Sequence, residues 1–485
     1  MDFVLRQRDA LRWIAPVCLT WWLSACVAPE SVHPSVSRVD DATLGLAPSN
    51  AAVQAHWWTD FADPQLTLMI ECGLRDNPTL DIAIARLEAA RAQVAESRSG
   101  LLPSLSGNAQ VARARIGDKL VPPPVGGPSG TLFQMGASFN WDLDLFGRQR
   151  DLMRSAEAHV RAAGSDEQAA RLFLSVVIAQ TYVNLTRAYQ QVGVAEGIVA
   201  TRQRSVELIT ARRHNDLASD FELQTGQTLL AQAQQARTRA LRDRDVLVHA
   251  LAALVGRGAD FYGDVHPPQL TLTVAPRLPL VIPANLLARR PDIAASRARI
   301  DAAVDNRRAA AAAFLPDIDI GALAGLAAFG VGNFLKAGAG YYSAGPALSL
   351  PIFEGGRLRA QYAQSTADLD ASVAAYNDAV FTAVRDSADA ITNVRAADED
   401  VSEQLRVVAG LRNTVHLNQV RVSTGLASQL DAIDTGFRLL EAEQDLVRLR
   451  ADTLLRRIEL IAALGGGFSD DVVDPSLKTR TDQHE

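Results

Sequence analysis

Two segments of the chain repeat one pattern, and this duplication limits the folds that are open to it. Prolines stand 25 residues apart in both segments, at Pro78 and Pro103 and again at Pro291 and Pro316. The sequence ARLEAA within the first segment corresponds to ARIDAA within the second. A duplicated unit of this size predicts a single structure that is built from two interlocked halves.

The N-terminus has the pattern of an export signal. Arg6, Arg8 and Arg12 precede an apolar segment at residues 13–23, which is too short for a comfortable membrane span. The segment ends in the sequence LSAC, whose last residue is Cys26. We therefore expect residues 1–25 to be removed from the mature protein.

The LSAC ending resembles the bacterial lipoprotein box, in which the signal is cleaved before the cysteine and that cysteine is acylated. The resemblance implies a covalent lipid on Cys26, and Val27 in place of an aspartate implies delivery to the outer membrane. An ordinary cleavage site with an incidental cysteine is the alternative. Because Cys18 would leave with the signal, Cys72 is the only other thiol of the mature chain, and we expect no intramolecular disulfide.

Composition and motifs argue against nucleic-acid binding and against catalysis. The net charge is only −7, and no basic stripe with interleaved aromatic residues occurs. The eight histidines, including His214 and His416, are scattered without metal-ligand spacing, and neither a phosphate loop nor a nucleophile elbow is present. We expect a protein that is not an enzyme and that has no cofactor apart from the covalent lipid.

Two segments alternate apolar and polar residues in a way that predicts long β-hairpins. Residues 132–146 keep this alternation over about fifteen positions, and residues 104–116 are their expected partner. Such length suits a membrane strand better than a soluble hairpin. The second half repeats the pattern after Pro316 and before Phe353. The expected hairpins therefore occupy residues 103–146 and 316–353.

Each hairpin leads into a long predicted helix, at residues 149–214 and 358–423. At 1.5 Å per residue, such a helix measures about 100 Å. Short polar corners at residues 215–219 and 424–428 precede return helices with heptad-spaced apolar residues, which indicates a coiled-coil core.

The predicted organisation therefore has six parts. They are a signal peptide at residues 1–25, an extended lipidated tether at 26–63, a first repeat at 64–265, a linker at 266–283, a second repeat at 284–465 and a C-terminal tail at 466–485.

These features together resemble the TolC/OprM-like outer membrane factors, specifically their lipoprotein branch. The sequences LLARRPDI at residues 286–293, IFEGGR at 352–357 and the corner at 425–434 carry the resemblance most specifically. An open sheet edge cannot be left in lipid, so four strands per chain already require an oligomer. The resemblance implies a mainly α-helical trimer whose twelve strands form one membrane β-barrel, continuous with a long helical barrel in the periplasm.

Three carboxylates near the corners are the candidate site. Asp431 and Asp434 lie three residues apart on one helix face, and Glu222 occupies the position of Asp431 in the first repeat. The resemblance implies that acidic residues there ring the periplasmic entrance, where crowding would raise their pKa values and attract cations. The alternative is a solvated helix start, where acids are favoured by the helix dipole.

The chain departs from the family pattern at the latch that closes this entrance. An aromatic residue and an arginine help to close it in the best-known members, and Val422 and Ala427 stand in the corresponding places here. Nearby basic residues such as Arg421 are possible substitutes.

The predicted function is a passive outer-membrane exit duct of a Gram-negative efflux system. Its partners would be two further copies of the chain, a periplasmic adaptor and an inner-membrane pump. A lipid-anchored periplasmic adaptor or coiled-coil scaffold is the alternative, and it predicts no membrane strands. The substrate does not follow from the sequence.

Overall fold

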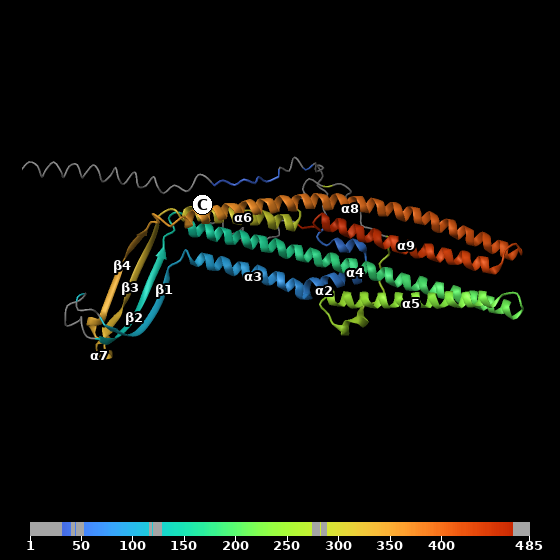
Figure 1. Cartoon of the computed structure of the whole chain (residues 1–485), viewed down its shortest axis with the longest axis horizontal. Coiled ribbons are helices and arrows are strands. Elements are labelled where there is room, and N and C mark those ends of the chain that lie inside the picture. The colour runs from blue at the N-terminus through green and yellow to red at the C-terminus, as the bar shows by residue number, and fades with distance from the viewer. Residues whose placement is uncertain are drawn as a thin grey trace, which may run out of the picture. The chain divides into compact units, whose positions relative to one another are not determined.

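The computed structural model describes residues 32–39, 44, 53–115, 119, 129–273, 282 and 289–468. Cys26 and residues 1–25 lie outside these residues, as do half of the predicted linker and most of the predicted tail. The chain forms two compact units, and each draws on both repeats (Figure 1). The first comprises Met1–Arg38, Leu87–Ala163 and Ser296–Tyr376, and the second comprises Val39–Arg86, Gly164–Ala295 and Asn377–Glu485.

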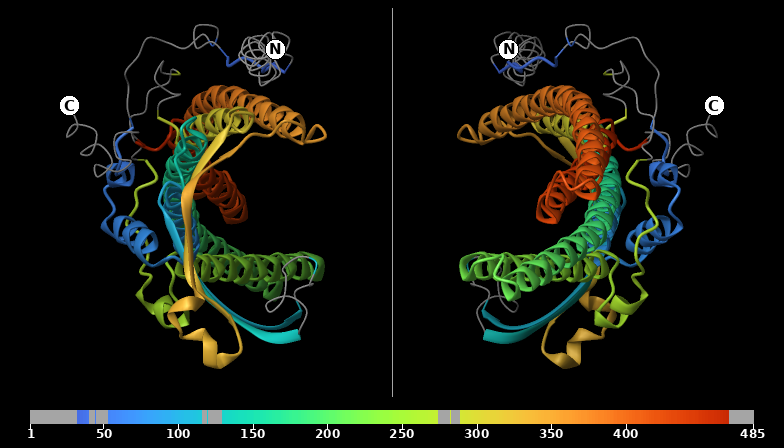
Figure 2. Two further views of the ribbon diagram at one scale, coloured as in Figure 1. Left: turned by 90° about the vertical axis from the view of Figure 1, so that its left-hand side faces the viewer. Right: turned by 90° about the vertical axis from the view of Figure 1, so that its right-hand side faces the viewer.

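The first unit contains the predicted hairpins, joined in one antiparallel sheet. Its strands are β1 (Ser104–Arg115), β2 (Ser129–Asp142), β3 (Asp317–Phe329) and β4 (Gly340–Ser349), paired in that order. Viewed from the end, the strands bend together as one curved sheet (Figure 2). Because β2 pairs with β3, the two repeats meet inside the sheet, while β1 and β4 are its edges.

The ladder register gives the sheet two faces of different character. One face is apolar and carries Leu105, Val111, Phe133, Met135, Phe139, Trp141, Ile318, Ile320, Leu326, Tyr342 and Leu348. The other is mostly polar and carries Ser106, Asn108, Gln110, Gln134, Ser138, Asn140, Asp142, Asp317, Asp319, Tyr341 and Ser343. Tyr342 and Leu105 are 89% and 76% exposed, so none of the residues that the structure describes forms a layer over the apolar face.

Two strands end earlier than the alternation predicts. β2 ends at Asp142 instead of continuing to Phe146, because the Asp144 backbone is left-handed, with φ 45°, and its carboxylate caps the next helix. Asp144 accepts hydrogen bonds from the Gln149 amide at 2.8 Å and from the Arg150 amide at 3.1 Å. β4 ends at Ser349, two residues before Pro351, which has no N–H to donate to the ladder.

The helices follow the predicted order. They are α2 (Pro64–Asp76), α3 (Pro78–Ser99), α4 (Arg148–His214), α5 (Asp220–Leu254), α6 (Pro291–Ala312), α8 (Arg357–Ser423) and α9 (Gln429–Ala463), with short turns at η2 (Trp57–Phe61), η3 (Ala259–Asp264), α7 (Val331–Phe334) and η5 (Ala337–Ala339). The two rods, α4 and α8, each have 67 residues and start one residue before the predicted positions.

One described helix is long and apolar enough to cross a membrane, judged by length and composition alone. α4 contains an 18-residue window that is apolar enough by composition. Half of this window is buried inside the protein, which is typical of a packed core helix.

The core of the second unit encloses the end of the predicted tether. Trp57, Trp58 and Phe61 are buried in η2, where an extended chain was expected, and they pack in the same cluster as Tyr182. Asp63 caps α2 and also accepts a 2.9 Å hydrogen bond from the Tyr182 hydroxyl. Burial and the Asp63 charge raise the pKa of Tyr182, so its hydroxyl keeps the donated proton.

The heptad seam of α9 is buried only in its C-terminal part. Ala451, Leu454, Ile458 and Ile461 are buried, and they belong to the main cluster of the second unit. The residues nearer the corner are half-buried: Leu430, Ile433, Phe437 and Leu440. The corner end of the hairpin is thus held by fewer apolar contacts than its base.

Residues 32–39 form an extended strap, and residues 32–38 of it lie along α8 in the first unit. Asp370 accepts hydrogen bonds from the Ser35 amide at 2.9 Å, the Ser35 hydroxyl at 2.7 Å and the Val36 amide at 3.2 Å. Arg307 of α6 donates to the Val32 carbonyl at 3.4 Å and to the Tyr362 hydroxyl at 2.6 Å. The strap is therefore fixed by directed polar contacts, and it runs along α8 away from the strands.

Candidate functional site

Both helical hairpins of the second unit end in corners with the same hydrogen bonds. In the first corner the Leu217 amide donates to the Arg212 carbonyl at 2.8 Å, and the Arg212 guanidinium donates to the Leu217 carbonyl at 3.2 Å. In the second corner Leu426 and Arg421 make the same two bonds, at 2.8 and 3.4 Å. Arg421, a candidate substitute for the missing latch, is thus engaged inside its own corner.

Two of the three predicted gate carboxylates are also helix caps. Ser428 and Asp431 form a capping box, in which the Asp431 carboxylate accepts from the Ser428 amide at 3.0 Å and from its hydroxyl at 2.8 Å. Ser219 and Glu222 form the same box at the start of α5, at 2.7 and 3.0 Å. The helix-start interpretation of these two residues therefore has a specific structural basis.

Within the single chain, the capping bonds shift the pKa values of Asp431 and Glu222 in the direction opposite to the one predicted for a crowded entrance. Hydrogen bonds from the Ser428 hydroxyl and amide hold the pKa of Asp431 below its ordinary value. Hydrogen bonds from the Ser219 amide and hydroxyl do the same for Glu222. Both carboxylates are fully exposed in the single chain, so each is charged at neutral pH.

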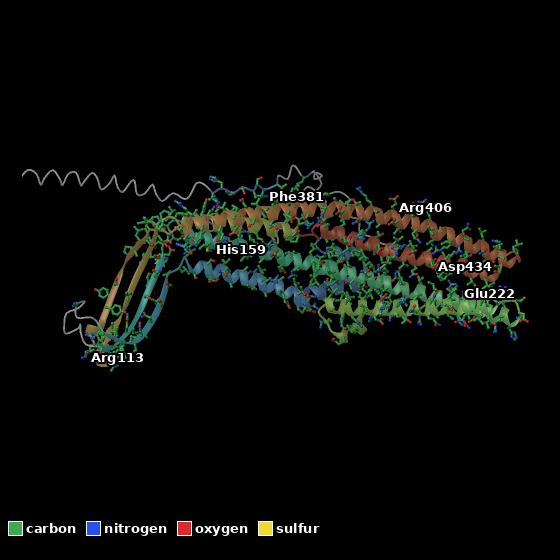
Figure 3. All side chains as sticks on the ribbon, in the orientation of Figure 1. Arg113, His159, Glu222, Phe381, Arg406 and Asp434 are labelled. Carbon is green, nitrogen blue, oxygen red and sulfur yellow. The ribbon has the colours of Figure 1, made fainter. Side chains whose placement is uncertain are left out.

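Asp434 is the predicted gate residue that has no capping contact. Asp434 forms an ion pair with Arg438, one turn along α9, at 3.3 Å, and both side chains are more than half exposed. Asp434 and Glu222 lie near the corner ends of their helix pairs (Figure 3). The fold thus brings the three carboxylates to the same end of the second unit. Ala427 lies in the second corner and Val422 lies just before it, and both are half-buried.

The polar face of the sheet is a second candidate surface, whose individual residues sequence analysis did not identify. Ser106 and Ser138 share a 2.8 Å hydrogen bond across β1 and β2, and Gln134 donates to the Tyr341 hydroxyl at 3.1 Å. A Cβ on Gly325 would lie 2.8 Å from that hydroxyl, so glycine is needed beneath the tyrosine. The alternation was visible in the sequence, but only the register shows which side chains share a face.

The described residues contain no group of three or more His, Cys, Asp or Glu side chains that could hold a metal ion. The predicted lipid attachment at Cys26 is outside these residues.

A model of the outer membrane efflux protein family matches residues 70–257 and 282–466, which is more than half of the chain. The chain belongs to the outer membrane efflux protein family. The two matched ranges correspond to the two sequence repeats, and the predicted resemblance to outer membrane factors is confirmed.

Individual relatives agree with this assignment. The chain is 29% identical over 411 residues to the solvent efflux pump outer membrane protein SrpC of Pseudomonas putida, covering 84% of this chain and 87% of that protein. It is 28% identical over 473 residues to the outer membrane protein OprJ of Pseudomonas aeruginosa, covering 94% and 96%. These lengths show that the likeness extends over nearly the whole chain.

A solved structure shows the same fold. The outer membrane protein VceC from Vibrio cholerae superposes with a TM-score of 0.78 at 29% identity, covering 86% of this chain and all of that one. The protein is thus an outer membrane channel of the efflux type, with its helical part in the periplasm.

Proposed function

We propose that this protein is the exit duct of a tripartite efflux system and that three copies form the conduit. The two-faced sheet carries this proposal: its apolar face suits lipid and its polar face suits a water-filled pore. β1 and β4 are edges within one chain, and lipid does not tolerate unpaired strand edges. Three four-stranded sheets would close a barrel of twelve strands.

We further propose that Asp434, with Asp431 and Glu222, forms an acidic ring at the periplasmic entrance. The support is their exposure at the corner ends of α5 and α9. Asp434 is the strongest member, because its charge is not used for capping. A periplasmic adaptor and an inner-membrane pump would dock at this end and supply the substrate.

Single-channel recording in planar bilayers tests the ring. Asp434→Asn and Asp431→Asn together should raise the conductance and weaken the preference for cations, since fewer charges crowd the entrance. Asp445→Asn is the matched control, because Asp445 is an exposed, arginine-paired carboxylate on the same helix and farther from the corner. Unchanged conductance and selectivity in the double variant would show that these carboxylates do not form the gate.

A lipid on Cys26 completes the proposal, and no enzymatic activity or other cofactor is part of it. Mass spectrometry of the mature N-terminus tests the lipid, since Cys26→Ser should abolish an acyl-sized mass increase. If the protein were instead an adaptor or scaffold, the connections between β1 and β2 and between β3 and β4 would lie inside the periplasm. In a Cys72→Ser background, a cysteine at Asn333 should react with a membrane-impermeant maleimide on whole cells, and complete protection would favour the adaptor.

A further inference from the structure

The apolar face of the sheet carries two arginines at one end of β1. Leu105, Val111, Arg113 and Arg115 lie on this face in that order along β1, because side chains on a strand alternate. Leu105 and Val111 are 76% and 65% exposed, as expected of side chains that meet lipid. Arg113 and Arg115 are exposed as well, so the lipid-facing surface becomes cationic where β1 ends.

This end of the strand lies at the outer surface of the membrane. The helices α3 and α4 join the sheet beside Ser104 and Asp142, whereas Arg115 precedes the loop at the opposite end, where Figure 3 places Arg113. Since the helical part is periplasmic, the loop end faces outward. Arg113 is eight residues beyond Leu105, about 26 Å along the strand and roughly 20 Å along the membrane normal at a usual tilt. That is near the edge of the apolar band, at headgroup depth.

Neither guanidinium has a partner among the residues that the structure describes. Their cross-strand neighbours are Thr131 and Ser129, which carry hydroxyls and no negative charge. The carboxylates of the strands, Asp142, Asp317 and Asp319, are on the polar face and at the other end. Two unpaired arginines beside lipid call for an anionic partner from the membrane itself, since guanidinium groups bind phosphate bidentately.

We propose that Arg113 and Arg115 bind the phosphate groups of an outer-leaflet glycolipid of the lipid A type. Successive residues on one strand face are about 7 Å apart, so two guanidiniums can contact one phosphorylated headgroup while its acyl chains cover Leu105 and Val111. The hydroxyls of Thr131 and Ser129 provide additional hydrogen bonds. This site holds a structural lipid on the outside of the barrel, and it is separate from the proposed conduction path.

Binding of diphosphoryl lipid A to the purified, detergent-solubilised full-length protein tests the site by native mass spectrometry. The Arg113→Gln/Arg115→Gln variant should bind about tenfold more weakly, because charge-assisted hydrogen bonds to phosphate are lost. Arg406→Gln, which removes an exposed arginine from α8, should bind like the parent protein. Arg113→Lys/Arg115→Lys should retain most of the affinity, since it keeps both charges.

Three results would overturn the proposal: equal affinity for a phosphate-free lipid A, an equal loss in Arg406→Gln, or unchanged binding in the double glutamine variant. Inorganic phosphate serves as competitor, and displacement of lipid A at comparable concentration would assign the site to free phosphate instead. If the double variant does not assemble, Arg115→Gln alone is measured, because Arg115 lies beyond the apolar band. Channel conductance in the same variants should stay unchanged, which separates this test from that of the duct.

Discussion

The two corners of the second unit share a backbone design but hold their helices together differently. Each has a left-handed residue, an arginine bonded to the corner carbonyl and a serine capping box. In the first corner, Ile209 of α4 packs against Gly226 of α5, where an added Cβ would lie 3.2 Å from the Ile209 side chain. At the matching place in the second corner, the Asn418 amide donates to the Thr435 hydroxyl at 2.7 Å.

This difference shows how the two copies of a duplicated unit can differ in how easily their helices separate. Close apolar packing resists separation, because water cannot replace it, whereas the part-buried hydrogen bond between Asn418 and Thr435 can exchange with hydrogen bonds to water at modest net cost. The first corner also has an ion pair between Arg213 and Asp220, but both side chains are at least half exposed and such pairs contribute little. We therefore expect the α8–α9 corner to open more readily than the α4–α5 corner.

The largest effect should come from removing the apolar contact. Ile209 is only 8% exposed, so Ile209→Ala should destabilise the first corner by about 2–3 kcal/mol through lost burial and a cavity. Asn418→Ala should cost the second corner about 1 kcal/mol, the net contribution of one hydrogen bond. Hydrogen exchange of the amides at residues 215–226 and 424–435 measures both. Equal losses would contradict the proposed difference.

The left-handed residue should give the next largest effect. Gly425 has φ 73° and Asp216 has φ 57°. Gly425→Val should cost about 1–2 kcal/mol, since a Cβ is disfavoured in this conformation. Asp216→Gly relieves that strain but adds freedom to the unfolded chain, so its effect should stay within about 0.5 kcal/mol. Hydrogen exchange of each corner is again the measurement, and a neutral Gly425→Val would mean that the corner adopts another turn.

These contrasts indicate how far sequence can predict the molecule. The rods and strands could be placed to within a few residues, because a change from period two to period 3.6 is strong over such lengths. The burial of Trp57 and Trp58 could not, since it depends on contacts with Tyr182 far along the chain. Strand β2 was predicted too long because the alternation continues through Asp144, while the capping role of that residue ends the strand.

The positions of the candidate carboxylates were predictable from the sequence, whereas their capping bonds were not identified from it. Acidic residues at both corners were visible, and so was the Ser-x-x-acid spacing of Ser219 with Glu222 and Ser428 with Asp431, which is the signature of a capping box. Crowding at the entrance predicts raised pKa values, whereas the capping bonds within the single chain act in the opposite direction. Asp434 has Thr225 as its counterpart in the first repeat, so it is the carboxylate that distinguishes the second corner.

The capping boxes should contribute equally to the two corners. Ser219→Ala and Ser428→Ala should each cost about 1 kcal/mol, because each removes the same side-chain acceptor from the third amide of the helix. Substitution by aspartate or asparagine should preserve most of the stability. Amide exchange in the first turns of α5 and α9 provides the comparison. A loss confined to one corner would mean that the two capping boxes contribute unequally to stability, although their hydrogen bonds are the same.

The smallest effect should be a common response to acid. The pKa values of Glu222 and Asp431 are lower in the folded protein than in the unfolded chain. The stability that these two ionised carboxylates contribute is therefore fully present above the ordinary carboxyl range near pH 4, and it is lost as the pH falls through their lower, folded pKa values. Hydrogen exchange, corrected for intrinsic rates, should show both corners loosening as the pH falls below the ordinary carboxyl range. Glu222→Gln should remove the response of the first corner only, and Asp431→Asn that of the second. Asp434→Asn should leave both responses in place, since Asp434 caps nothing; if it abolished the second, the acid sensitivity would belong to the entrance charge and not to the cap.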